Sequence, residues 1–172
     1  MLSKEDIELI SSTASNAKTI LEIGSRTGFS SVLLGGIAKK NFGKLYCVEC
    51  EPLEEWFVNM EKAGLEHYYL MLDTFSPWVD YTKLPTSLDY LFVDGDHRTS
   101  HAIADLHFFS PLVRVGGFIA VHDTNFKEEK IDRMVNLAIK IFLEDHPNFK
   151  LFKECKGQFG TKVLLKTEEK MK

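Results

Sequence analysis

The chain has 172 residues, a formal net charge of −4 at pH 7 and a pI of about 5.9. Because 44% of its residues are hydrophobic and 27% are charged, we expect an ordinary globular protein folded as one domain over residues 1–172. A mildly acidic chain without an apolar run of ~18 residues is unlike a nucleic-acid-binding or membrane-spanning protein, so we expect neither partner.

The first half of the chain predicts helices that alternate with strands. The opening residues, MLSKEDIEL, are charged and helical and do not resemble a secretory signal, and Ser3 with Asp6 makes a capping-box pattern for a helix over about 3–15. The apolar run KTILEIG predicts a strand that ends in a glycine turn. The elements expected after this turn are a helix over 29–43, a strand over 44–49, a helix over 52–64 and a strand over 67–72.

The second half continues this alternation and then ends in two strands. A polar, proline-containing stretch covers 73–85. The elements expected after it are a strand over 88–96, a helix over 100–113, a strand over 116–124, a helix over 128–145 and strands over 149–155 and 159–166. Only a Lys-Gly-Gln turn separates the last two strands, so they must be antiparallel. The predicted fold is α/β: a seven-stranded, mostly parallel sheet with one antiparallel C-terminal strand and helices on both faces.

The three cysteines do not indicate a disulfide framework, because their number is odd. Cys47 and Cys50 form a C-x-x-C, but residues three apart on a strand point to opposite faces of a sheet. We therefore expect neither a zinc site nor a redox pair there. Together with the absence of a secretory signal, this cysteine usage favours a cytoplasmic protein.

Polar residues follow each of the first five predicted strands. These residues are Glu22, Glu49, the pair Asp73-Thr74, the run Asp94-Gly95-Asp96-His97 and the run His122-Asp123-Thr124. In an open α/β sheet, ligands bind beyond the carboxyl ends of the strands. A single acidic strand end is usually a helix cap or a solvated turn, but five in one chain predict a crevice lined with carboxylates.

The glycine turn, in the stretch ILEIGSRTGFS, indicates which ligand this crevice takes. A dinucleotide fingerprint counted from Gly24 needs glycines at positions 26 and 29, where this chain has Arg26 and Phe29. A carboxylate just before the turn would repel a pyrophosphate, whereas it suits a ligand that carries an ammonium and a sulfonium. Glu49, which lies 21 residues after Gly28, suits the two hydroxyls of a ribose.

These residues carry a family resemblance over about residues 15–125. LEIGSRTGFSS resembles the first motif of class I S-adenosylmethionine-dependent methyltransferases, in particular the small-molecule O-methyltransferases of catechol-type architecture. LDYLFVDGDHRTSHAIADLHFFSPLVRVGGFIAVHDT is similar to a subgroup related to antibiotic and sugar O-methyltransferases, with an Asp-Gly-Asp-His motif at 94–97, Asp105-Leu106, Gly116-Gly117 and His122-Asp123. The resemblance implies a Rossmann-like methyltransferase fold. The chain departs from the subgroup at Thr99, where an aromatic residue is usual.

The resemblance also implies a binding site for S-adenosylmethionine. The residues that it assigns to this cofactor are Glu22, Gly24, Ser25, Gly28, Ser30, Glu49, Asp73, Thr74 and Asp94. In this assignment the backbone at both glycines lies against the cofactor, Glu22 reaches its amino group through water, and Glu49 holds the ribose. Asp73 and Thr74 would lie near the adenine. Ser30 either donates to the cofactor carboxylate or caps the following helix.

Two routes for removing the proton of an acceptor hydroxyl remain open. A hard cation such as Mg²⁺ could bind Asp94, Asp123 and a third ligand, for which His122 is our choice and Thr124 and Asn125 are the alternatives. Otherwise His97 or His122 could act as general base, because imidazole titrates near neutral pH. The predicted catalytic residues are therefore Asp94, His97 and His122.

Other titratable residues are expected to be structural. His67, His101, His107 and His146 lack a comparable setting, and Asp105 is expected to pair with His101 one helical turn earlier.

The function predicted from the sequence is S-adenosylmethionine-dependent O-methylation of a small hydroxylated molecule or a sugar, with or without a divalent metal. Two alternatives are an NAD-binding oxidoreductase domain and a methyltransferase-fold module that binds without turnover. Because no separate substrate domain is evident, specificity for the acceptor would come from the first helix, from residues 74–87, from residues 124–130, or from a second subunit of a homo-oligomer.

Overall fold

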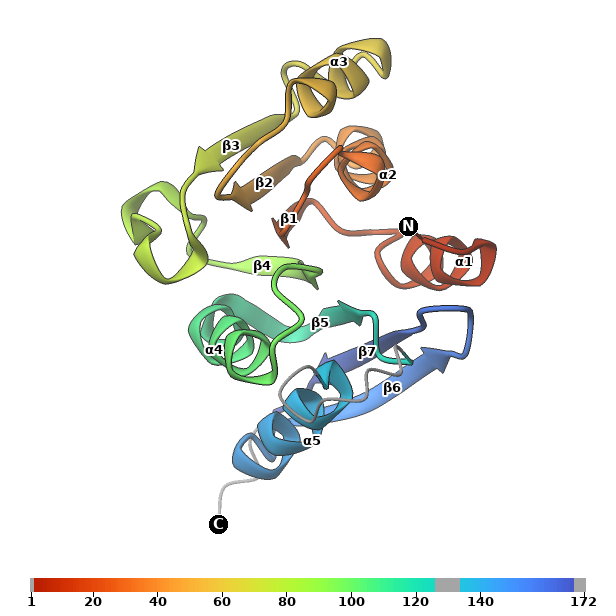
Figure 1. Cartoon of the computed structure of the whole chain (residues 1–172), viewed down its shortest axis with the longest axis vertical. Helices are drawn as coiled ribbons and strands as arrows, with labels where there is room; N and C mark the ends of the chain where they lie inside the picture. The colour runs from red at the N-terminus through yellow and green to blue at the C-terminus, as the bar shows by residue number, and fades with distance from the viewer. Residues whose placement is uncertain (1, 126–133, 169–172) are drawn as a thin grey trace.

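A seven-stranded sheet in the order β3-β2-β1-β4-β5-β7-β6 forms the centre of the computed structural model, which describes residues 2–125 and 134–168 (Figure 1). The strands are β1 Thr19–Ile23, β2 Lys44–Glu49, β3 Tyr69–Asp73, β4 Leu88–Val93, β5 Val113–His122, β6 Phe149–Cys155 and β7 Thr161–Lys166. The pairs β1–β2, β1–β4, β2–β3 and β4–β5 are parallel, while β7 is antiparallel to both β5 and β6. The predicted mostly parallel sheet with one reversed strand is confirmed.

Helices cover both faces of this sheet, as predicted (Figure 1). The helices are α1 Lys4–Thr13, α2 Phe29–Lys40, α3 Glu54–Lys62, α4 Thr99–Phe109 and α5 Val135–Asp145, with short 3-10 turns η1 Ser76–Trp78, η2 Tyr81–Lys83 and η3 Ser110–Leu112. In the described part of the chain, no helix is both long and apolar enough to cross a bilayer.

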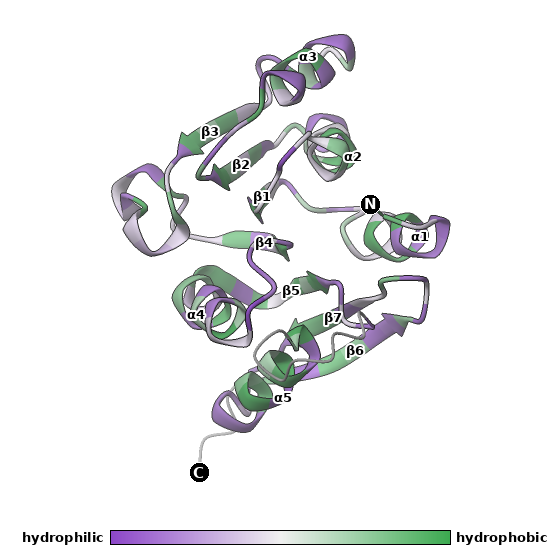
Figure 2. Ribbon diagram, viewed as in Figure 1, coloured by the Kyte–Doolittle hydropathy of each residue, from purple (hydrophilic) through white to green (hydrophobic). Residues whose placement is uncertain are grey.

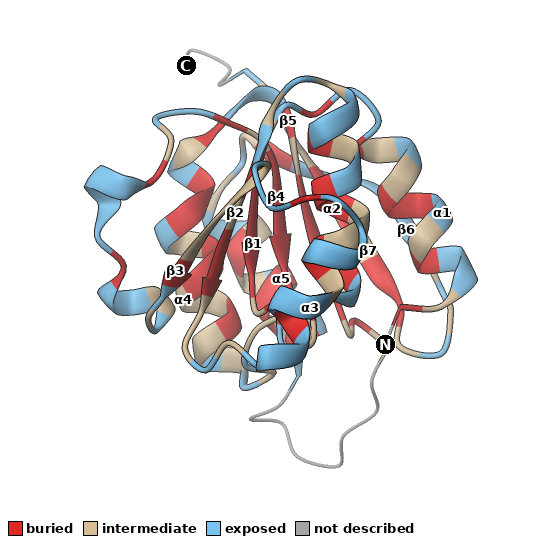
Figure 3. Cartoon of the chain, turned by 90° about the horizontal axis from the view of Figure 1, so that it is seen from above, coloured by how far each residue is buried: buried red, intermediate tan, exposed pale blue. Residues whose placement is uncertain are grey.

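Two apolar clusters lie on opposite faces of the sheet, because successive side chains of a strand point to opposite sides. On β1, Ile20 belongs to the cluster beneath α1, α2 and α3, whereas Leu21 and Ile23 belong to the cluster beneath α4 and α5. Figure 2 shows the central strands as mainly hydrophobic, and Figure 3 shows them as the buried layer of the molecule.

Several predicted element boundaries differ from the structure; the strand expected over 116–124, for example, is β5, which begins at Val113. The polar stretch over 73–85, for which no element was predicted, contains η1 and η2. The helix expected over 100–113 gives way to η3 at Ser110, because Pro111 cannot donate to the helical ladder. The helix expected over 128–145 begins at Val135 among the described residues, and the part predicted over 128–133 lies outside them.

Candidate functional site

A cavity of about 1070 Å³ opens beyond the carboxyl ends of β1, β2, β4 and β5, on the side where the sequence predicted a crevice. The strand ends and loops that line it are residues 23–27, 48–50, 74–78, 94–98 and 122–123, together with Phe29 and Ser30 of α2 and His101 and Asp105 of α4. Four of the five polar strand ends therefore contribute side chains to one cavity, although the end of β3 contributes Thr74 and not Asp73. The exception is the end of β1, where the side chain of Glu22 is buried and does not belong to the cavity lining.

The two glycines of the turn lie so close to other parts of the protein that a side chain at either position would collide with them. Gly24 has φ +81°, and a Cβ there would lie 2.4 Å from the carbonyl oxygen of Asp94. Gly28 has φ +84°, and its Cβ would lie 2.9 Å from Cδ1 of Trp56. Both positions need glycine for conformation and for space. Gly24 also lines the cavity, whereas Gly28 does not, so only the first could approach a ligand as the sequence predicted.

Glu22 lies behind the glycine turn and does not line the cavity. Its side chain is fully buried, and Oε2 accepts hydrogen bonds from Ser31 Oγ at 2.5 Å and, more weakly, from Cys47 Sγ at 3.5 Å. Ser31 Oγ in turn accepts from Nε1 of Trp56 at 2.8 Å. Burial raises the pKa of Glu22 to about 7. This carboxyl group therefore joins β1 to α2 and α3, and its predicted contact through water with a cofactor amino group stays a prediction.

Glu49 clamps the glycine turn from the end of β2. Its Oε2 accepts from the backbone N–H groups of Ser25 and Arg26, both at 2.9 Å, and Oε1 accepts from the N–H of Glu51 at 3.2 Å. Partial burial raises the pKa of Glu49, but these backbone donors outweigh it and lower the pKa below the ordinary value. The thiol of Cys50 also donates weakly to Oε1, at 3.5 Å. Because a carboxylate accepts about four hydrogen bonds, a ligand hydroxyl would take the place of this weak donor at Oε1.

The remaining predicted cofactor residues fall into two groups. Ser25, Ser30 and Thr74 line the cavity, and Ser25 Oγ is buried without a hydrogen-bond partner. Ser30 does not cap α2, because the N-cap is Gly28, which makes no side-chain capping bond. Asp73, by contrast, is exposed and is absent from the lining.

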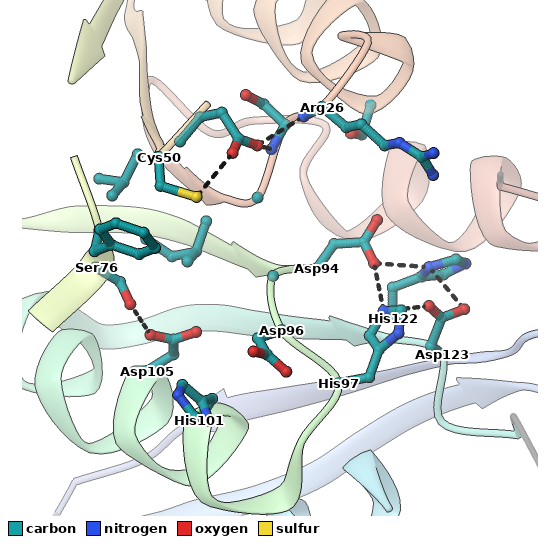
Figure 4. Close-up of a pocket in the computed structure, with 18 of the residues that line it drawn as sticks. Arg26, Cys50, Ser76, Asp94, Asp96, His97, His101, Asp105, His122 and Asp123 are labelled. Carbon is teal, nitrogen blue, oxygen red and sulfur yellow. Dashed lines mark hydrogen bonds and ion pairs between the residues drawn. The ribbon is translucent and has the colours of Figure 1, made fainter. Parts of the chain in front are cut away.

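The ends of β4 and β5 bring together Asp94, His97, His122 and Asp123 (Figure 4). Nε2 of His97 is 2.6 Å from Oδ2 of Asp123 and 3.9 Å from Oδ1 of Asp94. Nδ1 of His122 donates to Oδ1 of Asp94 at 3.1 Å and lies 3.3 Å from Oδ1 of Asp123. These four residues form one hydrogen-bonded group, in which two imidazoles alternate with two carboxylates.

The electrostatics of this group favour ionised carboxylates and protonated imidazoles. Hydrogen bonds to Asp123 and Asp94 raise the pKa of His97 to about 10. Burial lowers the pKa of His122, but the adjacent Asp94 carboxylate more than offsets this and raises it. Burial alone would raise the pKa of Asp94, whereas the bonds from His122 and His97 hold it below its ordinary value. In this arrangement both imidazoles donate hydrogen bonds, which makes them poor proton acceptors.

A metal could be held by three of these side chains. His97 and one carboxylate oxygen each of Asp94 and Asp123 offer ligand atoms that all lie within 4.8 Å of one another. His97 thus takes the place that the sequence analysis gave to His122, whose side chain is 1% exposed and lies beneath both carboxylates. The alternative ligand Asn125 is turned away, with Nδ2 donating to the carbonyl oxygen of Gly157 at 3.3 Å.

Asp105 and Ser76 line the cavity, although the sequence analysis assigned neither of them to a binding site. Asp105 is 3% exposed, and its Oδ1 accepts from Ser76 Oγ at 2.5 Å, so its hydrogen-bond partner is Ser76 and not the expected His101. Burial raises the pKa of Asp105 to about 6. The sequence contained a signal for this placement. His101 and Asp105 are four residues apart on a predicted helix that follows His97, so they lie on one face of that helix.

Thr99 has a different role from the aromatic residue that is usual at its position. Its Oγ1 accepts from the backbone N–H of Met134 at 3.0 Å, which ties the start of α4 to the start of α5. Thr99 does not belong to the cavity lining.

Two protein families match the sequence. The family described as "Methyltransferase domain" matches residues 21–124, which is more than half of the chain. The family described as "Rhamnosyl O-methyltransferase/CmcI" matches residues 82–167, which is half of it. Neither family is one of NAD-dependent oxidoreductases. No curated protein matches the chain.

Solved methyltransferases have the same fold. The O-methyltransferase TomG from Streptomyces achromogenes, involved in tomaymycin synthesis and solved in complex with S-adenosylmethionine, is 21% identical, with a TM-score of 0.75 over 98% of this chain and 82% of that chain. An O-methyltransferase from Bacillus cereus in complex with S-adenosylhomocysteine is 19% identical, with a TM-score of 0.75 over 96% and 83%. The S-adenosylhomocysteine-bound methyltransferase PaMTH1 from Podospora anserina is 15% identical, with a TM-score of 0.71 over 98% and 80%.

Proposed function

We propose that this chain moves the methyl group of S-adenosylmethionine to a hydroxyl of a small molecule. The chain belongs to the methyltransferase domain family and, over its second half, to the rhamnosyl O-methyltransferase/CmcI family, and it is therefore an O-methyltransferase. The name of the second family favours a sugar or a sugar-bearing metabolite as acceptor. The observation that carries the proposal is that one cavity contains both the Glu49-clamped turn and the group formed by Asp94, His97 and Asp123.

The cavity fits S-adenosylmethionine by the chemistry of its donors and acceptors. Glu49 is an ionised acceptor for the ribose hydroxyls, and Ser25 Oγ is a buried polar atom that lacks a partner. The first turn of α2, which begins at Phe29, has backbone N–H groups without helical acceptors, and these suit the carboxylate of the methionyl part. When bound, the cofactor supplies a methyl group on a positively charged sulfur.

Methyl transfer needs alignment and removal of one proton. When bound, S-adenosylmethionine would supply the methyl group, and its sulfur would keep the electron pair of the bond to carbon, so the residues of the chain have to hold the acceptor hydroxyl and take up its proton. We assign Asp94 as the acceptor of the hydroxyl proton, because its side chain is the more open of the two carboxylates, at 23% exposed against 11% for Asp123. His97 and His122 hold both carboxylates in position by hydrogen bonds.

A divalent metal on Asp94, His97 and Asp123 is a second route to this deprotonation, in which Asp94 is a metal ligand and does not take up the proton. Two oxygens and one nitrogen suit Mn²⁺ or Fe²⁺ as well as Mg²⁺, which prefers oxygen ligands alone. When bound, the metal would lower the pKa of the acceptor hydroxyl. The ligands must lose their protons first, so metal binding would displace the proton that His97 holds between the carboxylates.

The cofactor assignment is tested by isothermal titration of the whole chain with S-adenosylhomocysteine and, in parallel, with NAD. We expect micromolar binding of S-adenosylhomocysteine, and a tenfold or larger loss of affinity in Glu49→Gln, because an amide is a weaker acceptor for ribose hydroxyls than a carboxylate. The exposed substitution Glu66→Gln serves as the matched control. Binding of NAD without binding of S-adenosylhomocysteine would overturn the proposal.

The metal assignment is tested by titration with Mn²⁺ and with Mg²⁺. Asp94→Asn and Asp123→Asn should each weaken Mn²⁺ binding at least tenfold, because each removes one ionised ligand from a site of three. Asp96→Asn is the matched control: this carboxylate is nearby, but the Arg98 side chain and backbone N–H hold it outside the group. Unchanged Mn²⁺ affinity in both Asp94→Asn and Asp123→Asn would exclude the metal site.

A further inference from the structure

We propose that Asp105, held by Ser76, accepts a hydrogen bond from the exocyclic amino group of the cofactor's adenine and thereby selects adenosyl over other nucleosyl cofactors. The inference rests on the proposed function, since it requires that the cavity binds S-adenosylmethionine. It assigns recognition of the base to a carboxylate on α4, whereas the sequence analysis had placed Asp73 and Thr74, at the end of β3, near the adenine.

The cavity has two distinct polar ends. Figure 4 shows Asp94, His97, His122 and Asp123 on one side, and Ser76 with Asp105 on the other. In S-adenosylmethionine the sulfonium is attached through C5′ of the ribose and the base through C1′, so the methyl group and the adenine extend in different directions from the sugar. With the methyl group directed at Asp94 and the ribose at Glu49, the base reaches the end formed by Ser76 and Asp105.

The carboxylate of Asp105 is fixed and has one oxygen available to a ligand. Oδ1 accepts from Ser76 Oγ at 2.5 Å, and this bond fixes the carboxylate plane against η1. Oδ2 is directed toward the bare backbone of Gly95, where a Cβ would lie 3.4 Å from it. Gly95 also lines the cavity, so no side chain intervenes on that wall. The half-exposed ring of Phe75, next to Ser76, adds an apolar surface for a planar base.

The charges around Asp105 keep its carboxylate available as an acceptor. Asp96 is the nearby carboxylate, and Arg98 neutralises it through two side-chain nitrogens and a backbone N–H. His101, one turn earlier on α4, acts on Asp105 through its charge and lowers the pKa. With a pKa of about 6, Asp105 is mainly ionised at pH 7.5 and can only accept hydrogen bonds. An amino group on the base suits this acceptor, whereas a carbonyl oxygen at the same position would be repelled.

Asp73 cannot perform this role in the observed arrangement. It ends β3, but its side chain is exposed and the cavity lining does not include it. Asp96, the other carboxylate drawn beside Asp105 in Figure 4, is paired with Arg98.

The inference is tested by isothermal titration of the whole chain at pH 7.5 with S-adenosylhomocysteine and with S-inosylhomocysteine, in which a carbonyl oxygen replaces the amino group and N1 of the base carries a hydrogen. The wild type should prefer the adenosyl compound at least tenfold. In Asp105→Asn, the side-chain amide can accept from the amino group or donate to the oxygen, so this preference should fall to about threefold or less. Asp80→Asn, an exposed carboxylate of the same loop outside the lining, should retain the wild-type preference.

Two further results separate the possible failures. Wild-type protein that binds neither compound contradicts the proposed function. Wild-type protein that binds S-adenosylhomocysteine but shows no preference, or Asp105→Asn that keeps the full preference, contradicts the inference alone. Should Asp105→Asn fail to fold by circular dichroism, Ser76→Ala replaces it: loss of the fixing bond should lower the preference at least threefold, and an unchanged preference would overturn the inference.

Discussion

Glu22 is a carboxyl group enclosed in the apolar layer between β1, α2 and α3. A buried charge is costly unless it is paired, and the described residues give Oε2 only a hydroxyl and a thiol, while Oε1 has no hydrogen-bond partner. Burial therefore favours the protonated form. The group supports the glycine turn only as long as it keeps its proton.

This burial predicts that stability falls as the pH rises. The pKa of Glu22 is about 7 in the folded chain against an ordinary value of 4.5, so the contribution of this group is fully present below pH 4.5 and is lost as the pH rises through 7. The loss amounts to about 3 kcal/mol of unfolding free energy. Glu22→Gln should match the wild type at pH 4 in urea unfolding and exceed it at pH 8.5. Parallel pH profiles for the two proteins would contradict this account.

At the scale of elements, one carboxylate attaches α1 to the C-terminal strands. Asp6 completes the predicted capping box with Ser3, and its Oδ1 also accepts from Thr161 Oγ1 at 2.6 Å and Cys155 Sγ at 2.9 Å. Nε2 of His122, on β5, lies 3.7 Å from Oδ2. The first helix is thereby linked through Asp6 to the strand end that carries the candidate site.

Asp6→Asn should destabilise the chain by about 2–4 kcal/mol, because it removes a charged acceptor from a buried network and leaves donors without a partner. Burial raises the pKa of Asp6, but bonds from Cys155, Ser3 and Thr161 outweigh it and lower the pKa to about 2. This contribution is present above pH 3.8 and is lost as the pH falls through 2. Urea unfolding at pH 7 measures the change, with exposed Asp80→Asn as control. Equal stability of Asp6→Asn and wild type would show that the network is dispensable.

At the scale of the whole molecule, the order of elements and the reversal of the last strand followed from hydrophobic periodicity and turn length. The clustering of Asp94 with Asp123 was also predictable, since the carboxyl ends of parallel strands meet at one edge of the sheet. The burial of Glu22 could have been found by alternation, because Leu21 and Ile23 face one apolar layer and Glu22 must face the other.

Other features depend on three-dimensional distances that no local pattern contains. The close approach of Gly24 to the backbone of Asp94 arises where β1 and β4, far apart in the sequence, pair in the sheet. The bond between Ser76 and Asp105 joins a loop to a helix that lies 29 residues further along the chain. Sequence spacing gives the face on which a residue lies, but it does not tell which residue of another segment lies opposite.

The two tryptophans lie in opposite surroundings, and this gives the protein an optical probe of its own. Trp78 is 75% exposed at the edge of the cavity and packs against Phe75, whereas Trp56 is fully buried with its indole N–H bonded to Ser31. An exposed indole emits at longer wavelengths than a buried one and is quenched by solutes in water. A molecule that fills the cavity changes the emission of Trp78 and leaves that of Trp56 as an internal reference, so occupancy can be followed by fluorescence without any label.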